Sequence, residues 1–412
     1  MKIKMPEMAE YIVERLLQSG YDAYVVGGCV RDSLLGKPPN DWDICTSALP
    51  EETKQVFCNE KIIETGIKHG TIMLISEHVP YEITTFRIEG KYSDLRRPDR
   101  VKFVKKIDDD LARRDFTVNA MAYNNRSGLV DIYGGCEDLA AKKIRCVGNP
   151  HERFSEDALR IMRAIRFAAV LGFSLDDETK KAAEKLKMLQ KNIAKERLNV
   201  EFTKTLLSDN PMLIYEYRDV ISVFMNIVAL ADITTMRTLS LMPCDCAVRL
   251  ATLFYGIMQI ENDKDYNIGA ILSDMRYDNK TIKKVADIIS CTKQPLPKSL
   301  KTARFLVGRY GAENVYNAAL IENAYAKVIN NTDKIIKTGD VFSFIDEIKE
   351  KNLCVKISDL MIDGKDLLSV GTDNGIEIGK LLTKLLTKVI EGELPNEKDA
   401  LLEYVKKNRT GG

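Results

Sequence analysis

The chain has 412 residues, 45% of them hydrophobic, which is enough for roughly two to four domains with buried cores. The 61 Lys and Arg residues balance 60 Asp and Glu residues, so the net charge of +1 excludes a general polycation, and a nucleic-acid partner must be held by local basic patches. The 9 scattered cysteines argue against a disulfide framework or a zinc site, and no apolar run approaches a membrane-spanning length. We expect a reduced, cytoplasmic protein without a signal peptide or a membrane segment.

Short β-type runs alternate with helical segments up to about residue 150, a pattern typical of a mixed sheet backed by helices. From residue 151 onward, apolar residues recur almost throughout at helical spacing. We therefore predict an α+β fold, with a mixed-sheet head and an all-helical remainder that begins at Pro150 and has a joint at residues 294–297. The predicted strands are residues 23–26, 43–45, 71–75, 81–86, 101–104 and 129–132.

A glycine pair follows the first predicted strand. Gly27 and Gly28, with Arg31 after them, are typical of a tight turn whose backbone N–H groups approach a phosphate. A hairpin turn is the alternative interpretation.

Asp41 and Asp43 flank Trp42 on the next predicted strand. Because side chains alternate along a strand, the two carboxylates would point the same way and could share a divalent cation. Two Mg²⁺ ions held by such carboxylates would stabilise the attacking 3′-hydroxyl and the leaving pyrophosphate in nucleotidyl transfer. Glu82 could be a third carboxylate of this site or a residue on the wet face of its strand. A short D-x-D pattern is also common among solvated acids.

Two basic clusters come next. Residues 87–106 hold 8 Lys and Arg against 3 acids and predict a mobile loop that meets phosphates, or a surface loop without a role. Arg113, Arg114 and Asp115 begin a denser cluster that could offer guanidiniums to phosphate and acceptors to ribose hydroxyls. A helix-capping salt bridge is the alternative for this cluster.

The third cluster lies on a predicted helix with Ser155 as its N-cap. Asp157, Arg160, Arg163 and Arg166 follow at three-residue steps and would form one polar ridge. Asp157 could accept from an exocyclic amine and Arg160 could donate to a base edge, so the pair could read a nucleotide without a nucleic-acid template. Arg163 and Arg166 would face the phosphates. The alternative is a solvated arginine face with intrahelical pairs.

Taken together and in order, these motifs resemble those of the class II nucleotidyltransferases, the family of bacterial CCA-adding tRNA nucleotidyltransferases and bacterial poly(A) polymerases. The resemblance spans roughly the first half of the chain. The motifs that carry it are Gly27-Gly28-Cys29-Val30-Arg31-Asp32, Asp41-Trp42-Asp43, and residues 113–120, 156–160 and 196–201.

The resemblance implies a polymerase-β-like nucleotidyltransferase head followed by an all-α neck, body and tail. The implied domains are a head at residues 1–150, a neck that selects the base at 151–210, a body at 211–295 and a tRNA-binding tail at 296–412.

The resemblance also implies a role for individual residues. Asp41 and Asp43 would hold catalytic Mg²⁺, with Glu82 as the further candidate. Asp157 and Arg160 would act as an amino-acid template for CTP or ATP. The residues that would contact the triphosphate, the ribose or the base are Gly28, Arg31, Arg114, Asp115, Arg163 and Arg166, and those that would brace the template helix are Glu196, Arg197 and Glu201.

Two features favour complete CCA addition within this family. Residues 87–99 resemble the flexible loop of complete CCA-adding enzymes, and the C-terminal sequence lacks the strongly basic extension expected of poly(A) polymerases. We therefore expect an enzyme that adds CCA to the tRNA 3′ end from CTP and ATP. The alternatives are an A-adding enzyme or poly(A) polymerase of the same family and, in a different class, a non-catalytic tRNA-binding protein.

Overall fold

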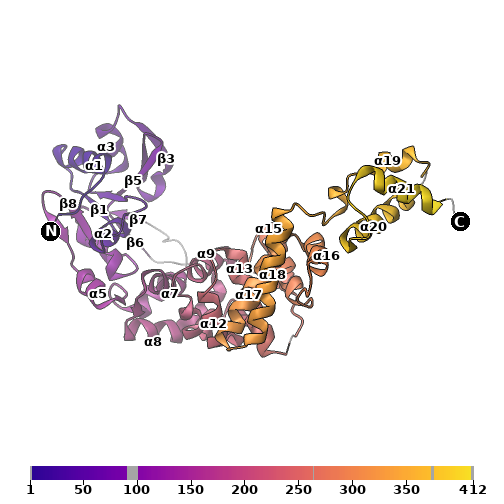
Figure 1. The fold of residues 1–412 in the computed structure, drawn as a ribbon. Coiled ribbons are helices and arrows are strands. Elements are labelled where there is room, and N and C mark those ends of the chain that lie inside the picture. The colour runs from indigo at the N-terminus through magenta and orange to yellow at the C-terminus, as the bar shows by residue number, and fades with distance from the viewer. Residues whose placement is uncertain (1, 91–100, 263, 373–374, 410–412) are drawn as a thin grey trace. The chain divides into compact units, whose positions relative to one another are not determined.

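The computed structural model describes residues 2–90, 101–262, 264–372 and 375–409. The chain forms two compact units, Met1–Ala229 and Leu230–Gly412. Figure 1 shows that the labelled strands gather in the N-terminal unit, whereas the C-terminal unit is helical. This arrangement confirms the predicted α+β class.

A mixed sheet forms the centre of the N-terminal unit. Its strands are β1 (Ala23–Val26), β2 (Ile44–Thr46), β3 (Lys61–Gly66), β4 (Thr71–Ser76), β5 (Val79–Thr85), β8 (Ala122–Asn124) and β9 (Gly128–Val130). They follow the order β3-β4-β5-β2-β1-β8-β9, in which β2 and β5 are parallel and the other neighbours antiparallel. Two small sheets pair β6 (Arg87–Glu89) with β7 (Val101–Phe103) and β10 (Lys143–Ile144) with β11 (Ser174–Leu175).

All six predicted strands are present with small shifts at their ends, but β3, β6 and β8 were not predicted. Asp41 and Asp43 are the main correction, because they precede β2 instead of lying on it. The stretch predicted as a basic loop is bounded by a β-ribbon in which Arg87 lies opposite Phe103. Residues 91–100, on which most of the loop prediction falls, lie outside the described residues.

Helices cover the sheet and continue beyond it to the end of the N-terminal unit. They are α1 (Glu7–Gln18), α2 (Gly28–Leu34), α3 (Pro50–Val56), α4 (Ile107–Ala112), α5 (Gly135–Ala141), α6 (Pro150–Glu156), α7 (Leu159–Leu171), α8 (Asp177–Leu186), α9 (Lys195–Leu206), α10 (Met212–Glu216) and α11 (Arg218–Ile221). Short 3₁₀ turns are η1 (Ile67–His69), η2 (Thr117–Asn119), η3 (Lys187–Asn192) and η4 (Asn226–Leu230).

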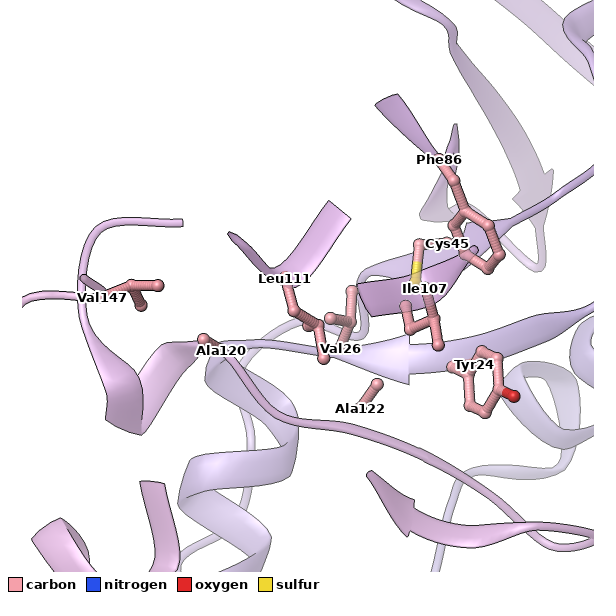
Figure 2. Packing of buried hydrophobic residues seen from close by; sticks show 9 residues of the cluster. All are labelled: Tyr24, Val26, Cys45, Phe86, Ile107, Leu111, Ala120, Ala122 and Val147. Atoms are coloured by element: carbon pink, nitrogen blue, oxygen red, sulfur yellow. The ribbon is translucent and has the colours of Figure 1, made fainter. Parts of the chain in front are cut away.

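The core beneath the candidate site joins α4 to the central strands. Figure 2 shows Ile107 and Leu111 of α4 with Val26 and Cys45 of β1 and β2 in one buried apolar cluster. Its remaining members are Tyr24, Phe86, Ala120, Ala122 and Val147. Because buried side chains are close-packed, this cluster fixes α4 against the sheet edge from which the site is built.

The C-terminal unit confirms the predicted helical remainder. Its elements are α12 (Ile233–Ser240), α13 (Cys246–Ile260), α14 (Ile268–Asp274), α15 (Asn279–Thr292), α16 (Leu300–Tyr310), α17 (Ala312–Val328), α18 (Thr332–Glu350), η5 (Ile357–Asp359), α19 (Gly364–Ser369), α20 (Gly375–Glu391) and α21 (Lys398–Arg409). The predicted joint at residues 294–297 separates α15 from α16. Among the described helices, none combines the length and the apolar character needed to cross a membrane.

Candidate active site

The strand, the glycine turn and the helix predicted at residues 23–34 are all present. Gly27 follows β1 with φ +79°, a conformation that L side chains rarely adopt, and α2 begins at Gly28. A Cβ on Gly27 would lie 3.0 Å from Nη1 of Arg114. The turn therefore needs glycine for its backbone angle and for the close approach of a guanidinium. The hairpin interpretation is wrong, because the turn leads into a helix.

Arg31 lies on α2 and is nearly buried. Its Nε and Nη2 donate to Asp32 at 2.8 and 3.0 Å, and its Nη1 donates to Oδ1 of Asn119 at 2.6 Å. The amide of Asn119 donates in turn to Asp115 at 3.2 Å. Arg31 is therefore tied to the Arg113–Asp115 cluster across 88 positions of sequence.

Asp41, Asp43 and Glu82 are all exposed beside this turn. The parallel register pairs Ile44 of β2 with Ile83 of β5, so Asp43 and Glu82 each stand one residue before the first pair. Partial burial and the negative charges of Asp41 and Glu82 raise the pKa of Asp43 to about 6, whereas Arg114 opposes the rise. The three carboxylates predicted to work together thus repel one another in the folded chain.

This charge pattern fits a divalent cation. No Lys or Arg within the described residues forms an ion pair with Asp41 or Asp43. Nor do three Asp, Glu, His or Cys side chains of that part of the chain come close enough together to hold a metal ion by themselves. Mg²⁺ commonly takes one or two protein carboxylates and completes its shell with water and substrate phosphates. A carboxylate pair with excess negative charge meets that requirement.

Arg113 and Arg114 both pair with Asp110, a fully buried residue of α4. Burial alone would raise the pKa of Asp110, but the charges of Arg113 and Arg114 outweigh it and lower the pKa. Nε of Arg114 is buried and has no hydrogen-bond partner among the described residues. The salt-bridge alternative for this cluster is confirmed, and Arg114 still keeps a free donor at the glycine turn.

Asp115 pairs with Arg163 rather than with its neighbours in sequence. Nε and Nη2 of Arg163 lie 2.9 and 2.6 Å from Oδ2 of Asp115. Burial alone would raise the pKa of Asp115, but the Arg163 charge and hydrogen bonds from Arg163 and Asn119 lower it to about 2. Asp115 is therefore ionised and fixed.

The predicted helix that carries the template residues is two helices, which corrects two predictions. Asn149 accepts from N–H of His151 as the N-cap of α6, whereas Ser155 lies inside α6 and its hydroxyl donates to the carbonyl of His151. Asp157 sits in extended backbone between α6 and α7 and accepts from N–H of Leu159 at 3.0 Å. Asp157 therefore does not share a helical ridge with the arginines, because its carboxylate caps the second helix.

Arg160 is nearly buried and points into the protein. Its Nη1 donates to Glu156 at 2.6 Å and its Nη2 to the carbonyl of Arg113 at 3.2 Å. Asp157 pairs with Arg197 of α9 at 3.0 Å. The proposed template residues are thus paired with protein groups, and Arg160 lies next to the cluster that contains Arg114.

The other two arginines of α7 lie against α9 and an aromatic ring. Arg166 pairs with Glu201 at 2.8 Å, and its guanidinium carbon lies 3.5 Å from the centre of the Phe167 ring. Glu201 also lies 3.5 Å from Arg163. The predicted bracing of the helix by Arg197 and Glu201 is therefore confirmed.

Sequence reasoning missed Asp110 and Phe167. Asp110 stands three and four positions before Arg113 and Arg114, a spacing that favours ion pairs on a helix and could have indicated its role. Phe167 lies within 5.4 Å of the guanidinium carbons of Arg31, Arg163 and Arg166. No sequence pattern points to that meeting of three cations on one ring, because Arg31 comes from a distant helix.

Family models match three parts of the chain. The Poly A polymerase head domain matches residues 23–145, an RNA- and SrmB-binding site of polymerase A matches 172–217, and tRNA nucleotidyltransferase domain 2 matches 252–405. These matches cover both compact units.

Whole-length relatives share one description. The chain is 36% identical over 403 residues to the CCA-adding enzyme of Ligilactobacillus salivarius, covering 96% of this chain and 95% of that protein. It is 37% identical over 410 residues to the CCA-adding enzyme of Latilactobacillus sakei, with coverage of 97% and 98%. The crystal structure of the Bacillus stearothermophilus CCA-adding enzyme in complex with CTP superposes with a TM-score of 0.77 at 28% identity over 99% of both chains. The chain therefore belongs to the CCA-adding enzymes, a family of nucleotidyltransferases.

Proposed function

We propose that this protein adds C, C and A to the 3′ end of tRNA from CTP and ATP, without a nucleic-acid template and with release of pyrophosphate. Relatives that cover nearly the whole chain support the reaction, and the similar enzyme of Bacillus stearothermophilus was solved with CTP. One observation carries the proposal to this chain: the repelling carboxylates around Asp43 stand beside Arg114, which has a free buried donor at the glycine turn.

The enzymes of this family are generally metal-dependent, and we propose Mg²⁺ as the ion. Asp41 and Asp43 would hold it, and Glu82 is the further candidate on the adjacent strand. When bound, the ion supplies positive charge that stabilises the attacking and leaving oxygens of the displacement. Asp43 must be ionised to bind a cation, so its pKa of about 6 in the metal-free protein suits a site that works at neutral pH.

We propose that Gly27 and Gly28 provide the turn over which the triphosphate lies, with Arg114 as the main cationic contact. Arg31 is already paired with Asp32 and Asn119, so its role would be to fix the turn and to add charge from behind. Asp115 would accept from a ribose hydroxyl through the oxygen that Arg163 does not take, since a carboxylate has several lone pairs.

Base selection is proposed for Asp157 and Arg160. The hydrogen bond from Arg160 to the carbonyl of Arg113 places the two proposed functions, base reading and phosphate binding, within one residue of each other. Glu156 and Arg197 hold the two side chains in the nucleotide-free protein. An incoming base would exchange with these partners, while Arg163 and Arg166 would support it from α7.

The domain division at residues 1–150, 151–210, 211–295 and 296–412 also remains a proposal, with tRNA binding assigned to the last segment. A cytoplasmic location is proposed as well. All 9 cysteines are free thiols, which suits a reducing compartment.

The decisive experiment incubates the protein with Mg²⁺ and a tRNA transcript that lacks its 3′ CCA. CTP alone, ATP alone and both together are supplied, and product length is measured on a sequencing gel. We expect growth by two residues with CTP and a stop at three with both. A long ladder with ATP alone would mean poly(A) synthesis, addition of A only to a transcript ending in CC would mean an A-adding enzyme, and no growth in any mixture would favour a binding protein.

A further inference from the structure

Asp110 is the most completely enclosed charged residue of the candidate active site, with 0% of its surface exposed. Nε of Arg113 donates to its Oδ1 at 2.9 Å, and Nη2 of Arg114 donates to its Oδ2 at 3.2 Å. The backbone N–H of Arg87 also donates to Oδ1 at 3.2 Å. One carboxylate thus joins both arginines to the first residue of β6, the strand that leads into residues 91–100.

The helix that carries Asp110 has little freedom to move. Ile107 and Leu111 of α4 lie in the buried cluster of Figure 2, against β1 and β2. Since such cores are close-packed, the Asp110 carboxylate has a fixed position relative to the strand that ends at Gly27. It can therefore serve as a reference point for the side chains bound to it.

The charges around Asp110 do not cancel. One carboxylate faces the two guanidiniums of Arg113 and Arg114, so one positive charge remains for an anionic ligand. Asp110 is ionised, because its arginine neighbours lower its pKa in spite of burial. It consequently fixes Arg114 by charge-assisted hydrogen bonding without removing the attraction for a triphosphate.

Two connections run from Asp110 to the proposed reacting groups. Arg114 reaches the glycine turn, where its Nη1 lies 3.0 Å from the position of a Cβ on Gly27, and its charge acts on Asp43. The carbonyl of Arg113 accepts from Nη2 of Arg160 at 3.2 Å. A shift of the Arg113–Arg114 segment would therefore disturb the phosphate side and the base side together.

We propose that Asp110 is a positioning residue for nucleotidyl transfer. It acts through Arg114 to align the triphosphate with the metal-binding carboxylates, and through Arg113 to align Arg160 with the incoming base. Asp110 itself is enclosed and does not contact the substrate. The proposal rests on the proposed function of this site.

The test compares kcat and nucleotide KM of wild type and Asp110→Asn on a tRNA transcript lacking CCA. Asparagine keeps the shape of the side chain but loses one acceptor and the charge, so Arg114 is less well held. We expect kcat to fall on the order of 100-fold, as for a reactant misplaced by about 1 Å. KM should change less than about threefold, because the added net positive charge still attracts the triphosphate.

A double-mutant cycle separates positioning from a general loss of structure. If Asp110 acts through Arg114, Asp110→Asn in an Arg114→Ala background should lose little beyond Arg114→Ala alone. Asp138→Asn is the matched control, since Asp138 is a nearly buried aspartate of α5 that pairs with Arg145 at 2.9 Å and has no bond to Arg114. The control should leave kcat unchanged while lowering thermal stability to a comparable degree.

Three results would overturn the proposal: an unchanged kcat in Asp110→Asn, equal losses in Asp138→Asn, or fully additive losses in the cycle. Failure of wild type itself to extend the transcript would instead contradict the proposed function. The wild-type reaction run in parallel therefore tells the two failures apart.

Discussion

The two halves of the candidate active site treat charge in opposite ways. Around Asp43 the carboxylates repel one another and the pKa rises to about 6. Along α7 the arginines have carboxylate partners: Arg160 with Glu156, Arg163 with Asp115 and Arg166 with Glu201. There the pKa of Asp115 falls to about 2.

The difference indicates which half needs a ligand. A carboxylate pair that forms no ion pair within the described chain is completed only when a cation arrives, so its charge is held ready for binding. The arginines of α7 are already neutralised, which makes that half rigid before any nucleotide enters. A ligand there must exchange partners with the protein, and such exchange favours selectivity over strength of binding.

Removing a carboxylate from the uncompensated half should have the largest effect. Asp43→Ala removes a proposed metal ligand, and we expect incorporation of CMP to fall by about 1000-fold or more, since the ion stabilises charge in the transition state. Affinity for tRNA should be nearly unchanged because the substitution leaves the rest of the surface intact. Primer extension and a filter-binding assay measure the two quantities.

The matched control for this variant is Glu178→Ala, an acid of α8 that is exposed and pairs only with the exposed Lys181 among the described residues. It should extend tRNA at the wild-type rate. Retained incorporation in Asp43→Ala would contradict the metal assignment.

Breaking the compensated half should cost stability first. Glu201 is nearly buried and serves both Arg166 and Arg163, so Glu201→Gln leaves two guanidiniums short of a counter-charge. Loss of one partner from a buried pair costs about 3 kcal/mol. Urea unfolding measures the change, and Glu178→Gln, in an exposed pair, should change the free energy of unfolding by less than about 0.5 kcal/mol. Equal effects in the two variants would show that the α7 arginines do not depend on Glu201.

The first half of the site was easier to predict from sequence than the second. The glycine turn and the D-x-D residues follow from local rules, because strand alternation and a left-handed glycine act within a few residues. The start of β2 was misplaced by one residue, although the carbonyl of Asp43 already accepts from N–H of Val26 at 3.0 Å. Such boundaries depend on the neighbouring strand.

The break at Asp157 was missed because helical periodicity continues across it. The pair Asn149-Pro150 is a recognisable N-cap followed by proline at the first helical position, and could have moved the predicted start of α6. The burial of Arg160 could not be predicted, since it depends on the carbonyl of Arg113, 47 positions earlier. Tertiary contacts decide which arginines of a regular pattern are paired.

Exchange of partners on the compensated half predicts a moderate loss of selectivity. Arg160→Lys keeps the positive charge beside Glu156 but loses the planar guanidinium that could donate to a base edge in two places. We expect discrimination between CTP and UTP to fall about tenfold, a range typical of one lost recognition contact. Competition experiments with mixed nucleotides measure the ratio.

Arg153→Lys is the control for this change, because Arg153 pairs with the same Glu156 oxygen at 3.1 Å but is not proposed to read the base. Selectivity should survive in Arg153→Lys. If both variants, or neither, lost discrimination, Arg160 would not be the template residue.

The smallest effect should appear in the metal-free protein. Because the pKa of Asp43 is raised above its unfolded value, ionisation at neutral pH disfavours the folded state; the benefit of the neutral form is complete below about pH 4 and is lost as the pH rises through about 6. Asp43→Asn should therefore raise the melting temperature at pH 7 by about 2 °C or less, since solvent screens an exposed group, and should change little at pH 4.

Added Mg²⁺ sharpens this last comparison. It should stabilise wild type at pH 7 by binding the ionised carboxylates, and should stabilise Asp43→Asn much less. The opposite pattern, a variant that melts lower without metal and responds fully to it, would mean that the negative charge of Asp43 is already balanced within the protein. The contrast between the two halves of the site would then fail at its uncompensated half.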